Sequence, residues 1–180
     1  MRVFALMLVG LTAVATHGEV VDGPVFLFPQ VARYGGIVQL PAAAEPPRRG
    51  AHLVFDITSD SKPDELNRGL ESVARYLNLN AEAGFQPAEV KLALVLHGAA
   101  TKAALNDSAY ARHVGATMNP NLDLIHELKA CGVEVLVCGQ SLARNKFAPG
   151  DVAKEVAVAV SAMSVNANKQ QDGYSYLSIH

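Results

Sequence analysis

The stretch Val-Leu-Val-Cys-Gly-Gln-Ser at residues 135–141 is an apolar, β-branched run that stops at Cys138 and continues as a helix start would. In an open parallel α/β sheet, ligands bind at the carboxyl ends of the strands. A thiol there lies beside the N–H groups of the following helix, which favour the reactive thiolate. We therefore expect Cys138 to be an exposed, reactive thiol. The alternative is a buried cysteine that acts as a small apolar residue.

Outward from this stretch, the sequence alternates between strand and helix patterns. The apolar run at residues 90–96 is typical of a strand buried on both faces in a parallel sheet. Strands are predicted at residues 52–57, 90–96, 133–138, 156–160 and 174–179. Helices are predicted at residues 63–82, 102–105, 109–113, 142–146 and 161–168, with one more that opens at residues 119–121 and ends at Gly132. This order predicts an α/β fold, a three-layer α/β/α sandwich around a mostly parallel five-stranded sheet.

The composition is that of one globular domain. The chain has 180 residues, of which 50% are hydrophobic and 18% are charged, and its formal net charge is −2. A chain of this length has room for one domain with a proper core. The net charge provides no electrostatic reason to expect nucleic acid or an anionic membrane as a partner.

The first 50 residues differ from the rest of the chain. Residues 1–18 have a positive start, an apolar stretch and small residues, which predicts a cleaved secretory signal peptide and export to the periplasm. The alternatives are an uncleaved anchor or a buried helix. Residues 19–50 are rich in proline and glycine and predict an extended arm, either mobile or lying against a neighbouring subunit. Residues 51–180 form the α/β domain, which we expect to be soluble once the signal is removed.

The chain has two cysteines, Cys131 and Cys138. They flank a predicted strand, which places them roughly 20 Å apart. A disulfide requires Cα atoms within about 7 Å, so we expect no bridge between them. A free thiol in an oxidising compartment favours a functional role for Cys138.

Common cofactor and catalytic motifs do not occur. The chain has no GxGxxG or GxxxxGK[ST] loop for a nucleotide and no GxSxG turn for a nucleophilic serine. The histidines and cysteines lack the spacing of a zinc site. We therefore expect no dissociable cofactor and no metal ion.

Three polar residues end the first three predicted strands: Asp56, His97 and Cys138. If these strands are neighbours, their ends lie one or two strand spacings of about 4.8 Å apart. His97 would then hold Cys138 as a thiolate or move a proton, and the alternative is that it caps a turn. For Asp56 the favoured interpretation is a turn-forming carboxylate. Asn119 and Asn121 are candidates for the same pocket, although ordinary capping is the favoured interpretation.

Several segments together resemble the DsrE/DsrF-like family of sulfur-relay proteins, in particular its exported members. The most specific are Leu-Val-Leu-His-Gly-Ala-Ala at residues 94–100 and Val-Cys-Gly-Gln at residues 137–140. The others are residues 34–36, 70–78, 119–122, 132–136 and 171–174. The resemblance implies a Rossmann-like sandwich that assembles as a homotrimer or homohexamer. It also implies that a strand-end cysteine carries sulfur as a persulfide, and Cys138 matches that position.

From this resemblance we expect a sulfur carrier or sulfurtransferase, and whether it is an enzyme stays open. Its partners would be sulfur donor and acceptor proteins or small sulfur compounds. Gly139, Gln140 and Ser141 would bind the anionic sulfur, with His97 assisting. One alternative is a non-catalytic module that binds a small anion or a metal through His97 and Cys138 in the same oligomeric pocket. Another is a structural oligomer whose thiol is incidental.

Overall fold

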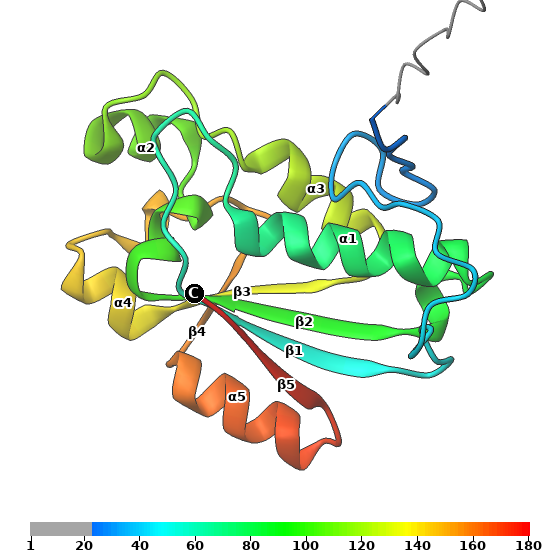
Figure 1. Cartoon of the computed structure of the whole chain (residues 1–180). Coiled ribbons are helices and arrows are strands. Elements are labelled where there is room, and N and C mark those ends of the chain that lie inside the picture. The colour runs from blue at the N-terminus through cyan, green and yellow to red at the C-terminus, as the bar shows by residue number, and fades with distance from the viewer. Residues whose placement is uncertain (1–22) are drawn as a thin grey trace, which may run out of the picture.

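The computed structural model describes residues 23–180, so the predicted signal peptide at residues 1–18 lies outside the described residues. All strand pairs in its five-stranded sheet are parallel, and the spatial order is β4-β3-β2-β1-β5 (Figure 1). The strands are β1 (His52–Ile57), β2 (Lys91–Leu96), β3 (Glu134–Cys138), β4 (Ala157–Ala159) and β5 (Ser175–Ile179). The predicted α/β fold is confirmed.

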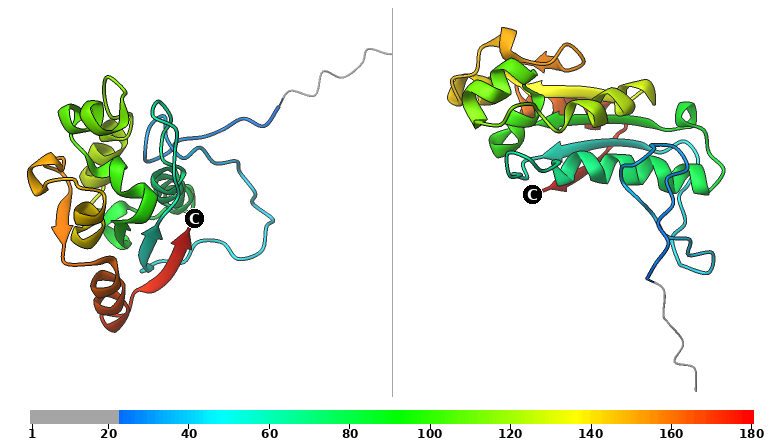
Figure 2. Two further views of the ribbon diagram at one scale, coloured as in Figure 1. Left: turned by 90° about the vertical axis from the view of Figure 1, so that its left-hand side faces the viewer. Right: turned by 90° about the horizontal axis from the view of Figure 1, so that it is seen from above.

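Helices cover both faces of the sheet. The α-helices are α1 (Arg68–Glu82), α2 (Asp107–Val114), α3 (Leu122–Ala130), α4 (Gly139–Arg144) and α5 (Ala162–Gln171). The 3-10 helices are η1 (Pro87–Glu89), η2 (Gly98–Ala104) and η3 (Pro149–Asp151). Figure 2 shows α1 and α3 on one side of the sheet and α5 on the other.

The side-chain alternation of the strands creates two cores. On β1, Phe55 and Ile57 pack with α1 and α3 in the larger core, whereas Val54 faces α5. The smaller core, on the α5 side, also contains Val95 of β2 and Cys138 of β3. Successive strand residues point to opposite faces, so each strand contributes to both layers. The reactive thiol predicted from the sequence therefore belongs to the α5 face.

The helix predicted over residues 63–82 begins five residues later than expected. Asn67 has an extended backbone, and its side chain accepts hydrogen bonds from the N–H groups of Gly69 and Leu70. This N-cap satisfies donors that a helix start leaves free, which fixes the beginning of α1 at Arg68. The residues before it, including Pro63, form a loop at the carboxyl end of β1.

Two other segments differ from prediction in a similar way. Residues 98–104 form one continuous 3-10 helix, η2, instead of a short helix at residues 102–105. The helix after β3 begins at once, at Gly139, and not at residue 142. The strand and the helix therefore meet at Cys138 with no connecting loop.

The Pro/Gly-rich arm packs against its own domain from residue 27 to residue 37. Leu27 and Ile37 form an antiparallel bridge, and Val31 is fully buried in the larger core. The side chain of Asn78 on α1 accepts from the N–H groups of the arm and donates to its carbonyls. The interpretation of this segment as mobile is therefore wrong for residues 27–37, because a buried amide of α1 pairs with their backbone. Contact of the arm with a neighbouring subunit stays a prediction. Among residues 23–180, none of the helices combines the length and apolar character needed to span a lipid bilayer.

Candidate functional site

The carboxyl ends of β1, β2 and β3 bring three of the predicted side chains to one edge of the sheet. Leu96 of β2 is paired with Val137 of β3, so one further step in this register sets His97 beside Cys138. The ladder between β1 and β2 also extends to this point, because the N–H of His97 donates to the carbonyl of Ile57 over 3.1 Å. Neighbouring strands lie about 4.8 Å apart, so His97 and Cys138 are adjacent on the edge.

Cys138 is buried, with 5% of its surface exposed. It packs in the smaller core with Leu136, Ala162 and Val165, so the expectation of an exposed thiol is wrong. The reason is the start of α5, which covers the end of β3 on this face. Cys131 is also a free cysteine and is partly buried.

Polar donors nevertheless surround the Cys138 sulfur. Burial raises the pKa of this thiol, but the Ser141 side chain and the N–H groups of Ala162, Ser141 and Gln140 outweigh burial and lower the pKa. Cys138 is the N-cap residue of α4 yet makes no side-chain capping hydrogen bond of ordinary geometry. These donors therefore act on the thiolate mainly through their electrostatic attraction to its negative charge. They come from two elements, α4 and α5.

The two cysteines are expected to react with an alkylating agent in a fixed order as the pH rises. The lowered pKa of Cys138 means that its thiolate forms at a lower pH. For Cys131, burial raises the pKa, and its thiolate forms only at a higher pH. Peptide mass spectrometry after iodoacetamide treatment across a pH series measures both midpoints. Ser141→Ala is expected to move only the Cys138 midpoint upward, and a Cys138 midpoint above that of Cys131 would contradict the assignment.

Gly139 has a different role from the one expected. It was predicted to bind the anionic sulfur, but the backbone donors near the sulfur belong to Gln140, Ser141 and Ala162. The side chain of an N-cap residue faces the second and third N–H groups of the helix, and Gly139 is the first helical residue. A Cβ at Gly139 would lie 2.9 Å from the carbonyl oxygen of Ala159, so the glycine lets β4 approach the end of β3.

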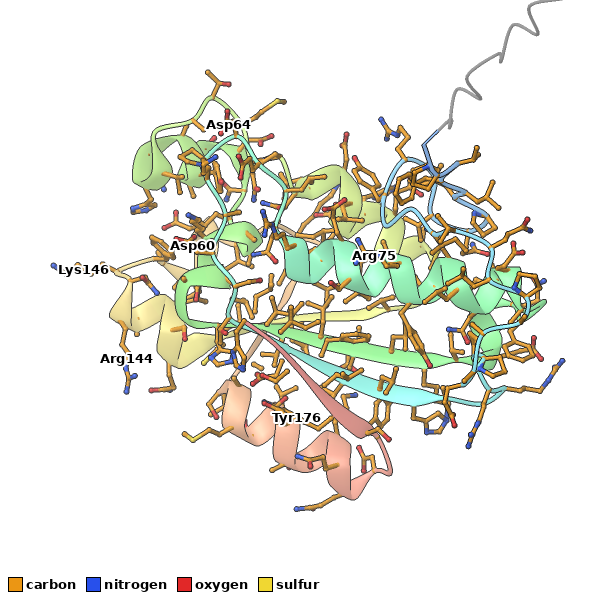
Figure 3. All side chains as sticks on the ribbon, in the orientation of Figure 1. Asp60, Asp64, Arg75, Arg144, Lys146 and Tyr176 are labelled. Carbon is orange, nitrogen blue, oxygen red and sulfur yellow. The ribbon has the colours of Figure 1, made fainter. Side chains whose placement is uncertain are left out.

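Asp56 is the centre of a polar cluster on the same face of the sheet. Its carboxylate accepts hydrogen bonds from Nε2 of His97 over 2.8 Å, from Nδ2 of Asn166 over 2.9 Å and from the hydroxyl of Tyr176 over 2.6 Å. Figure 3 labels Tyr176 between β5 and α5. The interpretation of Asp56 as a turn-forming carboxylate is therefore wrong, because the strand continues through it and its partners are side chains of other elements.

Burial alone would raise the pKa of the Asp56 carboxyl. The hydrogen bonds from Tyr176 and Asn166, together with the charge and hydrogen bond of His97, lower the pKa below its usual range. The hydrogen bond to Asp56 is the main cause that raises the pKa of the Tyr176 hydroxyl. At neutral pH the carboxylate is thus ionised and the tyrosine is a neutral donor.

Sequence reasoning missed Asn166 and Tyr176. The available signal was Asp56 itself, because a carboxylate inside an otherwise apolar strand needs donors if the strand is buried. Which residues supply them depends on the pairing of β5 with β1 and on the position of α5. Neither is visible in the local pattern.

Asn119 and Asn121 lie in the loop before α3, and their side chains bond within the fold. The Nδ2 of Asn119 donates to the carbonyls of Ala103 and Leu105, over 3.0 and 2.6 Å. The Oδ1 of Asn121 accepts from the N–H of Asn67 over 2.7 Å, so it does not cap its own helix. Both residues are buried, and these contacts support a structural role for them instead of the predicted binding role.

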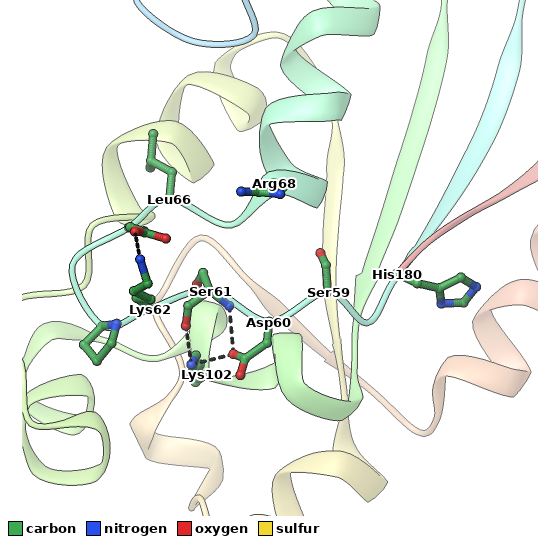
Figure 4. A pocket seen from close by; sticks show the side chains of 10 residues that line it. Ser59, Asp60, Ser61, Lys62, Leu66, Arg68, Lys102 and His180 are labelled. Atoms are coloured by element: carbon green, nitrogen blue, oxygen red, sulfur yellow. Dashed lines mark hydrogen bonds and ion pairs between the residues drawn. The ribbon is translucent and has the colours of Figure 1, made fainter.

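A cavity of about 530 Å³ lies next to this edge, lined mainly by the loop between β1 and α1 (Figure 4). Its charged groups largely neutralise one another, since Lys62 pairs with Glu65 and Lys102 pairs with Asp60. Cys138 does not line this cavity. Within residues 23–180, no three His, Cys, Asp or Glu side chains come together as a metal site would require.

Comparisons with known proteins agree with this architecture. The model of the DsrE/DsrF-like family matches residues 52–179. A solved structure described as a protein of unknown function, MTH1491 from Methanobacterium thermoautotrophicum, is similar with a TM-score of 0.53 and 20% sequence identity. The match covers 72% of this chain and 99% of that one, and at this identity it bears on the fold alone. No curated protein matches this chain.

Proposed function

The chain belongs to the DsrE/DsrF-like family, which is associated with sulfur relay, and from this membership we propose that it carries sulfane sulfur as a persulfide on Cys138. The observation that carries the proposal is the set of donors around the Cys138 sulfur, which lowers the pKa of a buried thiol. A thiolate is the form of cysteine that attacks sulfur, and a buried cysteine without such donors would be inert.

The proposed reaction is an exchange between sulfur atoms. The Cys138 thiolate attacks the outer sulfur of a persulfide or of thiosulfate, and a new S–S bond forms as the S–S bond of the donor breaks. The departing thiolate or sulfite takes the electron pair of the broken bond, so no external oxidant is needed. Because only 5% of Cys138 is exposed, a small sulfur compound reaches it more easily than a protein does.

The test is sulfur loading followed by mass spectrometry. The purified protein is incubated with polysulfide in parallel with an established sulfur carrier. We expect the Cys138 peptide to gain one or more sulfur atoms, which a reducing agent then removes. An unchanged mass at a donor concentration that loads the established carrier would contradict the proposal.

We further propose that this protein contacts a partner protein or a second copy of itself. Val158 on β4, Val160 in the connection that follows and Met163 at the start of α5 are exposed apolar side chains close to the end of β3. Such patches commonly mark protein interfaces, which supports contact with a partner or a second copy. Assembly as a homotrimer or homohexamer and export to the periplasm stay predictions.

A second candidate is a non-catalytic module that binds a small anion. The same N–H and hydroxyl groups that favour the thiolate would also attract a bound anion. This candidate predicts that thiosulfate binds reversibly and leaves the mass of the protein unchanged. Equilibrium dialysis combined with the loading experiment separates the two candidates.

A further inference from the structure

Asp56 is a carboxylate in an unfavourable place. It has 7% of its surface exposed, and it sits on the β1 face that packs against α5. A buried carboxylate is retained only where other groups compensate for its lost hydration. Three side chains do so: His97 at the end of β2, Asn166 on α5 and Tyr176 on β5.

The arrangement defines the tautomer of His97. An ionised carboxylate only accepts hydrogen bonds, so the Nε2 atom of His97 that faces Asp56 must carry a proton. In a neutral imidazole the other nitrogen, Nδ1, then has a free electron pair. Among residues 23–180, the ring nitrogen of His97 that makes a hydrogen bond is Nε2. Nδ1 is therefore the atom able to accept a proton.

We propose that Asp56 is a positioning residue that holds His97 with Nδ1 as a base for the Cys138 thiol. Three neighbouring strands supply the three groups, Asp56 from β1, His97 from the end of β2 and Cys138 from β3. The register between β2 and β3 sets His97 beside Cys138. Tyr176 and Asn166 complete the set by fixing the carboxylate. We call this transfer of a proton from Cys138 to His97, with Asp56 behind His97, the proton relay. It adds a base to the proposed function, and it rests on that function for the identity of the sulfur donor.

The proton balance is simple. The S–H bond of Cys138 breaks, its electron pair stays on sulfur, and the proton moves to Nδ1 of His97. The thiolate then attacks the sulfane sulfur of a persulfide or thiosulfate, and the imidazolium returns the proton to the departing thiolate or sulfite. Asp56 stays ionised throughout and stabilises the imidazolium.

Among the other titratable groups on this face, Tyr174 packs against the smaller core and stacks on His52 at the start of β1, the opposite end of that strand from Asp56. On β5, Tyr176 is a neutral donor to Asp56, and His180 at its end contacts Thr58 and Ser178. On α5 the charged residue is Lys169, which pairs with Glu134 at the opposite end of β3. On α4 it is Arg144, which is exposed. The pair of Asp56 and His97 is thus expected to add to the effect that the Ser141, Gln140 and Ala162 donors have on the Cys138 thiolate.

The experiment measures the pH midpoint of Cys138 alkylation without any sulfur donor. Asp56→Asn is expected to raise the midpoint by about one unit, because the imidazolium that stabilises the thiolate is lost. If Asp56 acted only through its charge, the midpoint would fall, since a negative charge near the sulfur is removed. Asp60→Asn is the matched control, because it removes an exposed carboxylate of the same type that pairs with Lys102. It should leave the midpoint unchanged.

A double variant tests whether the effect of Asp56→Asn on the alkylation midpoint depends on His97, as a proton relay requires and a general structural effect does not. In a His97→Gln background, Asp56→Asn should cause no further rise, and an equal rise in both backgrounds would overturn the inference. Nitrogen NMR of histidine-labelled wild-type protein provides a test without mutation, in which a neutral ring protonated at Nδ1 would also overturn it. Because these measurements use no sulfur donor, failure of sulfur loading would refute the proposed function and leave the relay standing.

Discussion

Cys138→Ser is expected to reduce sulfur loading from polysulfide to the background of the unmodified peptide. A serine hydroxyl stays protonated at neutral pH and is a weak nucleophile unless a base activates it, and it forms no S–S bond. The Cys138 side chain lies at the end of β3 against α5, where a hydroxyl can accept from the same donors as the thiolate. The fold should therefore persist, and the loss of loading should reflect chemistry.

The control for this variant is Cys131→Ser. Cys131 has a raised pKa through burial, and a weak hydrogen bond from Gln30 opposes this effect. It should load little sulfur, so its removal should leave the sulfur content of the protein unchanged. The proposal fails if Cys138→Ser still gains sulfur, or if loading disappears with Cys131 instead. Intact mass and peptide mapping distinguish these outcomes.

Asn78→Ala is expected to have the largest effect on stability, because one buried amide holds the arm. The Oδ1 of Asn78 accepts from the N–H groups of Gln30 and Val31, over 2.9 and 2.8 Å. Its Nδ2 donates to the carbonyls of Tyr34 and Gly35, over 2.9 and 3.0 Å. At about 1 kcal/mol net for each of these four hydrogen bonds, we expect the free energy of unfolding to fall by about 4 kcal/mol. Urea denaturation measures the change.

The arm should also become sensitive to proteases in this variant. A fully buried Val31 would be exposed once its backbone partner is gone. Asn80→Ala is the matched control, since Asn80 lies on the same helix and is buried, and its side chain donates within that helix to the carbonyl of Tyr76 one turn earlier. Equal loss of stability in both variants would contradict the role of Asn78, as would an arm that resists proteolysis in Asn78→Ala.

The close approach at Gly35 explains why the arm docks at this place on α1. A Cβ at Gly35 would lie 2.2 Å from the backbone nitrogen of Arg75, and the residue has a φ of +61°. Only glycine combines that conformation with such close contact between backbones. The sequence shows the pair of glycines at residues 35–36, but it does not show which helix they meet.

Part of the candidate site followed from local patterns. Each strand end is marked by a change from an apolar run to polar or glycine residues, which is how Asp56, His97 and Cys138 were selected. Their convergence required only that the three strands be neighbours, which the order β3-β2-β1 satisfies. The local pattern does not show the importance of Asp56, because its partners on α5 and β5 are more than a hundred residues away in the sequence.

The sequence by itself determined the alternation of strands and helices and the position of a cysteine at a strand end. Periodicity and turn residues act over a few neighbouring positions, so they can be recognised without the fold. Tertiary structure alone decided that α5 buries Cys138, that Asp56 gathers His97, Asn166 and Tyr176, and that the arm packs on α1. These contacts join segments distant in the chain, and their energies depend on burial and on unpaired polar groups, which exist only once the layers have packed.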